Sequence, residues 1–351
     1  MTQAEQKDST LTWPLLPKMS WRHILRPVAA AVGKPQVQSV ADNGNKVAPE
    51  PIAVVDKLDE ALRSGDNWQY FQVPADYRGD QELVITVGTA ANANIAIAIG
   101  ANARVHIREQ RWAQATRGQL HNEVRLQIGA GAQVRYSTTD NFSGSDVLIY
   151  RRAELAANAT LDWYAGIFGA VTGAFEHRVE LLGTGSQAHV NTAVLAGGSG
   201  QLVCTSRVTN RGRHTQGTIK QHGVVTGSAH LIMNGIGSIV RGARGSDAQQ
   251  ENRVLMLTPD ARAEANPLLL IDENDVTAGH AASVAAVDQD QLYYLSTRGI
   301  SKDVALRLLV RGFLLGILPG DLPAATQQAL AASIDQVLQG SISSEGAAKH
   351  E

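Results

Sequence analysis

The phrase Ile-Gly-Ala-Asn-Ala-Arg-Val at residues 99–105 recurs along the chain at a nearly constant interval. Three further copies begin 29, 27 and 27 residues apart, and two looser copies begin at Val225 and Leu257. Each close copy has an apolar residue, a turn with Gly or Asn, a small residue and a second apolar residue. A turn that returns at a fixed interval indicates one structural unit repeated along the chain. The three close copies are Ile128-Gly-Ala-Gly-Ala-Gln-Val134, Leu155-Ala-Ala-Asn-Ala-Thr-Leu161 and Leu182-Gly-Thr-Gly-Ser-Gln-Ala188.

Apolar and polar residues alternate on both sides of these turns, for example at 95–99, 124–128 and 179–181. This period of two is typical of half-buried strands. The chain has 33 Gly and only 5% aromatic residues, so its core must be filled with small residues, which suits thin stacked layers. We therefore predict a mainly β fold with a right-handed parallel β-solenoid (β-helix) core. A plain β-sandwich would explain the strands but not the spacing of the turns.

Helical patterns flank this core. Met19–Val32 and Val54–Arg63 have apolar residues at helical spacing, with a linker-like stretch between them. The helical pattern returns after about residue 290, where Ser301 can act as an N-cap and Ala324–Leu338 follows as a further helix. The predicted division is an N-terminal helical region and linker at 1–75, a β-solenoid core at 76–290, a C-terminal helical region at 291–340 and a disordered tail at 341–351.

The composition excludes several classes of protein. With 31 Lys and Arg against 33 Asp and Glu, the chain has no overall positive field for nucleic acid or anionic lipid. Its single cysteine, Cys204, excludes an internal disulfide framework, a Cys₄ zinc site and an iron–sulfur cluster ligated wholly by this chain. The sequence shows neither a secretory signal nor an apolar run of the ~20 residues that span a bilayer. We expect a cytoplasmic protein.

Other chemically suggestive patterns have simpler structural explanations. The Gly-x-Gly pairs precede further alternating strand rather than a helix, so they predict turns and not a dinucleotide site. His214, His222 and His230 are spaced eight apart, but glycines interrupt any strand there, which favours surface histidines over a metal trio. Cys204 lies in an apolar strand and is predicted to be a small buried residue. The acidic cluster at 272–275 could supply the paired carboxylates of a solenoid polysaccharide enzyme.

Three blocks near the C-terminal end of the predicted core identify a family. They are Ala243-Arg-Gly-Ser-Asp-Ala-Gln-Gln-Glu-Asn-Arg-Val-Leu-Met-Leu257, then Leu270-Ile-Asp-Glu-Asn-Asp-Val-Thr-Ala-Gly-His-Ala-Ala-Ser283, then Asp288-Gln-Asp-Gln-Leu-Tyr-Tyr-Leu-Ser-Thr-Arg-Gly-Ile300. In this order and spacing the chain resembles the SufB/SufD family of iron–sulfur cluster assembly proteins. Asn234-Gly235 matches a further strand of the family pattern. The short chain, its helical start and the absence of SufB's cysteines favour the SufD branch.

The resemblance implies a non-enzymatic scaffold subunit of a SufBCD complex. Such a subunit pairs with SufB through the β-solenoid and binds the SufC ATPase through its C-terminal helices. ATP-driven dimerisation of SufC is expected to reshape the interface at which a nascent cluster is built. The SufC-docking candidates are Arg298, Gly299, Leu308, Leu309 and Phe313. Packing of the same helix against the core is the competing explanation, and both can hold on opposite faces.

The resemblance also singles out one site residue. His280 matches a family histidine near the SufB–SufD interface, and a neutral imidazole can ligate iron. A structural role for His280 stays open, and Asp275 is a weaker candidate ligand. Ala278 stands where the family has cysteine and Ala281 where it has glycine, so any thiolates must come from SufB. We therefore expect no cofactor bound stably by this chain alone, only transient iron or an iron–sulfur cluster shared with SufB.

Two alternatives remain from the sequence. The first is a homodimeric β-solenoid structural protein that uses the same exposed sheet edge without SufB. The second is a polysaccharide-active β-helix enzyme, which requires carboxylates and aromatic residues to converge on one groove. The partition between homo- and hetero-complexes distinguishes the first alternative from the scaffold, and the placement of the acidic residues tests the second.

Overall fold

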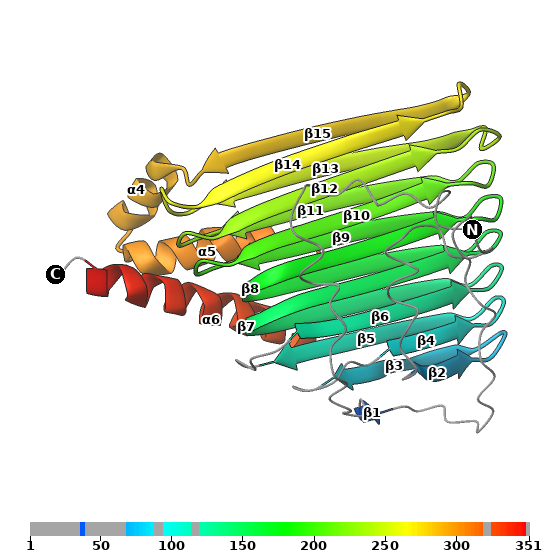
Figure 1. The fold of residues 1–351 in the computed structure, drawn as a ribbon, viewed down its shortest axis with the longest axis horizontal. Helices are drawn as coiled ribbons and strands as arrows, with labels where there is room; N and C mark the ends of the chain where they lie inside the picture. The colour runs from blue at the N-terminus through cyan, green and yellow to red at the C-terminus, as the bar shows by residue number, and fades with distance from the viewer. Residues whose placement is uncertain (1–35, 39–67, 88–93, 114–118, 319–323, 349–351) are drawn as a thin grey trace, which may run out of the picture.

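The computed structural model describes residues 36–38, 68–87, 94–113, 119–318 and 324–348 (Figure 1). These residues form fifteen strands followed by three helices, which confirms the mainly β prediction. The predicted helices at Met19–Val32 and Val54–Arg63 lie outside the described residues. The strands are β1 Gln36–Gln38, β2 Trp68–Val73, β3 Arg78–Val87, β4 Asn94–Ile99, β5 Arg104–Ala113, β6 Gln119–Ile128, β7 Gln133–Leu155, β8 Thr160–Leu181, β9 Gln187–Ala196, β10 Gln201–Asn210, β11 Gln216–Val225, β12 His230–Ile239, β13 Ser246–Met256, β14 Arg262–Ile271 and β15 Val276–Ala286.

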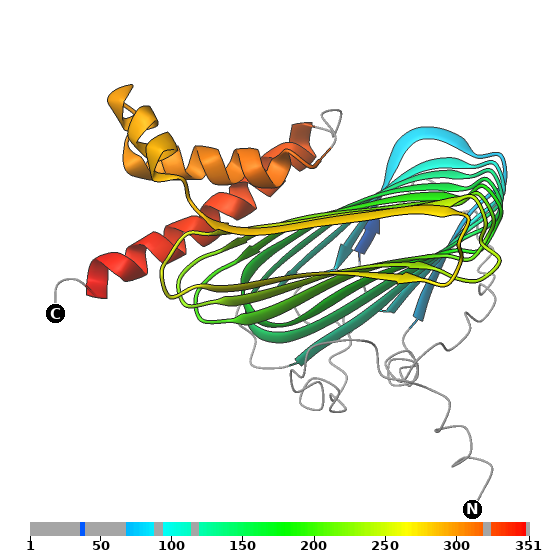
Figure 2. The same cartoon turned by 90° about the horizontal axis from the view of Figure 1, so that it is seen from above.

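The strands wind into a parallel β-solenoid with two stacked faces (Figures 1 and 2). Sheet 1 contains β2, β4, β6, β10, β12, β14 and the second halves of β7 and β8. Sheet 2 contains β3, β5, β9, β11, β13, β15 and the first halves of β7 and β8. Each coil therefore supplies one strand to each sheet. All described strand pairs are parallel except that of β1 with β3.

A column of stacked turns explains the sequence repeat. In successive coils, Asn102, Gly131, Asn158 and Gly185 all have positive φ, between 55° and 71°. The backbone N–H of each turn residue donates to a carbonyl of the next coil, as Asn158 does to Thr184 at 2.9 Å. Asn tolerates this backbone conformation and Gly adopts it freely, so the two residues alternate in the repeat. Gly is favoured at 185 for a second reason, because an added Cβ would lie 2.5 Å from Asn158 Oδ1 and the Asn158 side chain would have to shift.

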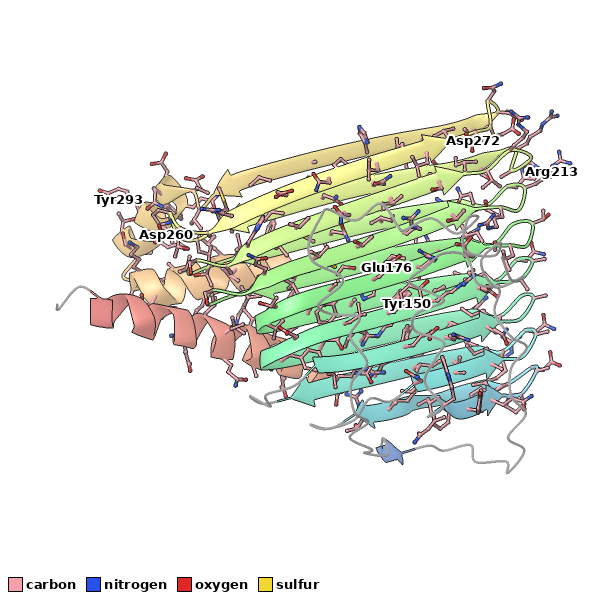
Figure 3. All side chains as sticks on the ribbon, in the orientation of Figure 1. Tyr150, Glu176, Arg213, Asp260, Asp272 and Tyr293 are labelled. Carbon is pink, nitrogen blue, oxygen red and sulfur yellow. The ribbon has the colours of Figure 1, made fainter. Side chains whose placement is uncertain are left out.

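The same column continues where the sequence shows no copy of the phrase. His214 and Gly245 have φ of 55° and 71° and occupy the equivalent positions in later coils. The looser copies at Val225 and Leu257 instead begin turns at the opposite edge, nearer the helices. Figure 3 shows this separation, with Arg213 at one edge and Asp260 at the other. Those two looser copies are therefore not members of the repeat, although they do form turns.

Two large apolar clusters fill most of the interior of the described solenoid. One lies beside the turn column and includes Ile97, Leu126 and Val190. The other lies nearer the helices and includes Phe175 and Cys204. Stacking of equivalent side chains from coil to coil buries both clusters almost completely.

Three helices follow the last strand: α4 Gln289–Thr297, α5 Lys302–Leu315 and α6 Ala324–Ala348. α5 and α6 pack at one end of sheet 2, where Val310 and Leu314 meet Leu195 and Val224 (Figure 2). Arg311 of α5 also donates from Nε to Asp335 Oδ1 of α6 at 2.9 Å. None of the helices in the described part of the chain is long and apolar enough to cross a membrane.

The element boundaries refine the predicted divisions. The solenoid strands begin at Trp68, before the predicted start at 76, and end at Ala286, close to the predicted end at 290. α6 continues past the predicted Leu338 to Ala348, so 341–348 of the predicted disordered tail are helical. No Pro occurs between residues 324 and 348, so no residue there removes a backbone donor and forces the helix to end at Leu338.

Candidate functional site

The two ends of the solenoid differ. At the N-terminal end, β1 pairs antiparallel with β3 and places Val37 opposite Ile85, which is fully buried. At the other end, β14 and β15 form the last coil, at the top of Figure 1. Among the strands that the structure describes, β14 pairs only with β12, and β15 pairs only with β13. The backbone edge of the last coil is therefore open to a further strand.

Positions whose side chains are buried in the other coils are exposed to solvent on this last coil. Val254 of β13 is 2% exposed, whereas Val284, its neighbour in register on β15, is 42% exposed. The same holds for Ala248 and Ala278, of which the first is buried and the second exposed. These β15 residues have the apolar character of a core position but no coil above them. The open end thus presents an apolar surface as well as an unpaired edge.

His280 lies in the middle of this open surface. Its side chain is the last in an interior ladder in which Trp163, Val190, Ile219 and Gln250 precede it in successive coils. Those four side chains are buried, whereas His280 is exposed. The imidazole therefore faces the position that the next coil would occupy.

Asp275 does not join His280. It precedes β15, and its carbonyl accepts the Gly245 N–H at 2.7 Å within the turn column. Because an extended chain rises about 3.3 Å per residue, the two residues lie about 16 Å apart along the strand. The structure therefore does not support a shared site of His280 and Asp275 within one chain.

The acidic cluster at 272–275 has a structural use. Glu273 Oε2 accepts the Gly242 N–H at 2.9 Å, and Oε1 accepts the Asn274 N–H at 3.0 Å. The backbone hydrogen bond from Gly242 is the main cause that lowers the pKa of Glu273. Within the described residues, no group of three His, Cys, Asp or Glu side chains is arranged to hold a metal ion.

Two amides lie directly beneath the open end. Gln250, 5% exposed, reaches across the interior and donates from Nε2 to the Leu268 carbonyl at 2.7 Å. The hydrogen-bond network orients the Asn252 amide so that Nδ2 donates to Gln221 Oε1 at 3.1 Å. Gly235 makes room for both amides, because a Cβ there would lie 2.9 Å from Gln250 Oε1 and from Asn252 Oδ1. This accounts for the Asn234-Gly235 motif.

Asn252 belongs to a line of buried polar side chains between the two apolar clusters, which we call the polar spine. Gln221 Nε2 donates to Ser206 Oγ at 2.7 Å, and Ser206 Oγ lies 3.4 Å from Thr192 Oγ1. The spine consists of two columns of residues that are in register from coil to coil, one column on each sheet. Its members are Glu109, Thr138, Thr192, Gln221 and Asn252 from sheet 2 and Arg151, His177 and Ser206 from sheet 1.

An ion cluster forms the far end of the spine. Arg151 donates to both Asp140 oxygens, at 2.8 and 2.7 Å, and to Glu109 Oε1 at 2.8 Å. Arg111 and the Tyr136 hydroxyl also donate to Glu109. Burial alone would raise the pKa of Glu109, but Arg111 and Arg151 outweigh it and lower the pKa to about 2. Burial raises the pKa of Asp140 despite its contact with Arg151. The cluster is balanced in charge, as a buried ion group must be.

Cys204 is buried as the sequence predicts, whereas of the three spaced histidines His222 is partly buried and not on the surface. Cys204 is fully buried in an apolar cluster, and burial raises the pKa of its thiol to about 12, which disfavours the thiolate form at neutral pH. His214 occupies a turn, and His230 pairs with Glu264 at 3.0 Å. His222 stacks on Phe313 of α5, with ring centroids 4.5 Å apart. The structure does not bring these histidines together.

The helical docking candidates divide into two groups. Arg298, at the C-cap of α4, and Leu308, 49% exposed on α5, face outward with Gly299. Leu309 and Phe313 are partly buried against the apolar clusters below the helices. The competing explanation, packing against the core, thus holds for these last two. Val304 of α5 is also exposed, and two exposed aromatic side chains of α4 that the sequence analysis missed complete the outer surface: Tyr293 and Tyr294.

Tyr293 shows how open this outer surface is. It is 72% exposed, and Figure 3 places it on α4 at the edge of the molecule. Arg298 lies over the neighbouring Tyr294 ring, 5.3 Å from its centroid. We call the exposed set Tyr293, Tyr294, Arg298, Val304 and Leu308 the helical surface.

The coordinates define a parallel β-solenoid with an open terminal coil and a lateral group of helices. Comparison with known proteins places it more narrowly: the chain belongs to the SufBD family. The family model for "SUF system FeS cluster assembly, SufBD core domain" matches residues 83–313. This confirms the resemblance read from the motif blocks.

Individual relatives agree. The iron–sulfur cluster assembly protein SufD of Bacillus subtilis is 44% identical over 188 residues, which are 53% of this chain and 43% of that protein. A SufBD family protein of Mycobacterium bovis is 30% identical over 196 residues, 55% of this chain and 23% of its own. One of Staphylococcus haemolyticus is 24% identical over 260 residues, 74% of this chain and 53% of its own. The likeness to SufD confirms the predicted branch, and the chain spans about half or less of the length of these relatives.

Proposed function

We propose that this protein is a non-enzymatic, SufD-like scaffold subunit for iron–sulfur cluster assembly in the cytoplasm. It pairs with SufB through the open end of its solenoid and binds the SufC ATPase through its helical surface. Family membership and the names of the relatives support the assembly role. The open end of the solenoid and the helical surface support SufB and SufC as the partners.

The open terminal coil carries the proposal. An unpaired strand edge with exposed core-type side chains is an aggregation hazard that proteins cover by pairing, by charge or by a capping element. β15 has neither a described capping strand nor a charged residue along Val276–Ala286, apart from the ionisable His280. A partner solenoid with a similar edge would supply the missing strand hydrogen bonds and bury Val284. This favours SufB, a protein of the same family, as the occupant.

The helical surface suits a second partner. Tyr and Arg are enriched at the centres of protein interfaces. Arg298, the C-cap of α4, lies over the Tyr294 ring, and Tyr293 and Leu308 are exposed nearby in sequence on α4 and α5. His222 ties α5 to the solenoid, since its Nδ1–H donates to the Phe313 carbonyl at 2.7 Å. Movement of a partner bound to the helices can thus reach β11 and, through it, the neighbouring coils.

The cargo at the interface is iron or a nascent cluster, not a resident cofactor of this chain. His280 is the one imidazole on the open end, and it can supply one nitrogen ligand. Ala278, at an equivalent interior position, supplies none, so the remaining ligands belong to the partner. The fully buried Cys204 cannot reach this surface without unfolding of the coil.

A homodimer that joins two open ends is the second candidate, and the same exposed edge supports it. The polysaccharide enzyme has less support, since Glu273 is committed to backbone hydrogen bonds within its turn.

The test is anaerobic co-expression of the full chain with SufB and SufC, followed by size exclusion with light scattering. A complex of one SufB, one copy of this chain and two SufC supports the proposal. A homodimer that ignores both partners contradicts it. In the same assay Leu308→Asp should release SufC while Leu308→Met retains it, because only the first places a charge in the helical surface.

A further inference from the structure

Gln250 contains a buried acceptor with no partner. Its Nε2 donates to Leu268, but its Oε1 accepts no hydrogen bond from any residue that the structure describes. The residue is 5% exposed, so water does not readily solvate that oxygen. A buried acceptor left unsatisfied is destabilising, because it has lost its hydrogen bonds to water. Such an atom calls for a donor close by.

His280 is placed to be that donor. It stands in register with Gln250 on the adjacent strand, and both side chains face the interior side of their coil. In-register neighbours have Cβ atoms about 5 Å apart, within reach of two long side chains. The His280 ring is exposed, and no described residue holds it in place. The free energy gained by satisfying the buried acceptor offsets the cost of a change of rotamer at His280.

Other groups on β13 cannot compete for the ring. Asp247, Glu251 and Arg253 alternate with Gln250 and therefore lie on the outer face of the strand. Glu251 is already paired there with Arg253. Asn252, the next interior residue, is fully committed to Gln221 and Gly235. Among the interior-facing side chains of β13, Gln250 Oε1 is thus the buried acceptor that the described network leaves without a partner.

We propose that Gln250 is the positioning residue for His280: its Oε1 accepts one ring N–H and so leaves the other ring nitrogen unprotonated and directed at the partner. Histidine ligands to metals usually donate their second N–H to an oxygen in this way, which fixes the tautomer and the ring orientation. The inference rests on the proposed function for the identity of the cargo. The contact itself is a property of this chain and can be tested without a partner.

The experiment is ¹⁵N-histidine NMR on the full-length free chain at a pH at which the ring is neutral, with the His280 signals assigned through His280→Gln. The wild type should show one ring N–H that exchanges slowly with water. Gln250→Met should speed that exchange by about 5- to 10-fold, the worth of one hydrogen bond. Gln250→Glu should restore slow exchange, because it keeps an acceptor oxygen.

The two variants share one loss, and Gln250→Glu differs from Gln250→Met by having a charged acceptor. Both remove the donation from Nε2 to Leu268, so a difference between them isolates the acceptor. Gln249→Met, on the outer face of the same strand, is the matched control and should leave His280 unchanged. Equal exchange in the wild type and Gln250→Met, or equal exchange in both Gln250 variants, overturns the proposal, with circular dichroism confirming that each variant is folded.

Failure of the contact and failure of the proposed function are distinguishable. Iron retention by the complex with SufB reports on the function, whereas ring exchange in the free chain reports on the contact. A slow ring N–H in a chain that binds no SufB would preserve the contact and remove the function.

Discussion

Val254 and Val284 are neighbours in register on β13 and β15, yet the first is buried and the second is nearly half exposed. The same residue type at the same interior position differs only in whether a further coil covers it. Val284 therefore has the character and position of a core residue but is not covered by other residues in this chain. This relationship is the physical basis for the claim that another chain completes the solenoid.

A charge at this position should block completion without harming the fold. Val284→Lys places its ammonium in water in the free chain but buries it in a complex, so we expect at least about 10-fold weaker pairing with SufB. Ser283→Lys lies on the outer face of the same strand and is the control. Titration by light scattering measures both, and equal affinities for the two variants would remove Val284 from the interface.

Loss of the His280 imidazole should affect cargo and not assembly. We expect His280→Ala to form the complex normally, because its side chain is exposed in the free chain, and to retain iron about 10-fold or more weakly. Iron per complex after anaerobic reconstitution is the measurement. His189→Ala, on an outer face where it pairs with Asp162, should change nothing. Dissociation of the complex by His280→Ala would instead assign the histidine a structural role.

Replacing a glycine of the turn column by alanine should lower the free energy of unfolding. Gly185→Ala forces an L-residue to φ of 71° and places its Cβ 2.5 Å from Asn158 Oδ1. We expect a loss of about 1–2 kcal/mol from the backbone conformation alone. Gly312→Ala is the counterpart, since its Cβ meets nothing within 4 Å, and should stabilise α5 by up to about 1 kcal/mol. Urea unfolding midpoints that move equally for both variants would contradict this account of the repeat.

The buried ion cluster should make stability depend on acid pH. The pKa of Glu109 is about 2 in the folded chain, below its ordinary 4.5, so its contribution is complete above about pH 4.5 and is lost as pH falls toward 2. That contribution is on the order of 3 kcal/mol, and the raised pKa of Asp140 offsets part of it as pH falls.

A single variant isolates the Glu109 contribution. Glu109→Gln should cost about 3–5 kcal/mol at pH 7, because it leaves Arg111 and Arg151 undercompensated in the interior. Its difference from wild type should shrink between pH 4.5 and 2. Asp162→Asn, which breaks a part-exposed pair with His189, should cost less than about 1 kcal/mol. A Glu109→Gln deficit that is constant across this pH range would exclude the ion cluster as its cause.

The solenoid could be predicted from the sequence because the residues of its turn column recur as a similar seven-residue phrase in four successive coils. The prediction did not recognise the turns of this column after residue 188. There, Arg-Gly-Arg-His at 211–214 adopts the same backbone geometry with different residues. Positive φ constrains a position to Gly, Asn, Asp or His, and that choice is too broad to recognise in one sequence.

The site could be predicted only in part. His280 was found through its motif, and Asp275 was a weaker candidate ligand from the same block, but along an extended strand the two residues lie about 16 Å apart. Gln250 and Asn252 occur in the first motif block, yet their interior position follows from coil register. The ion cluster contains Glu109, Asp140 and Arg151, of which the first and last are 42 residues apart in sequence. No local sequence pattern therefore indicates the cluster.

The most direct test of the central claim is hydrogen exchange of the β15 backbone amides in the free chain and with SufB present. Completion of the solenoid by SufB predicts that amides within Val276–Ala286 gain strong protection, while those in the turn column near Gly185 do not change. A stable complex in which the β15 amides exchange as fast as in the free chain would contradict the claim that the open end is the interface.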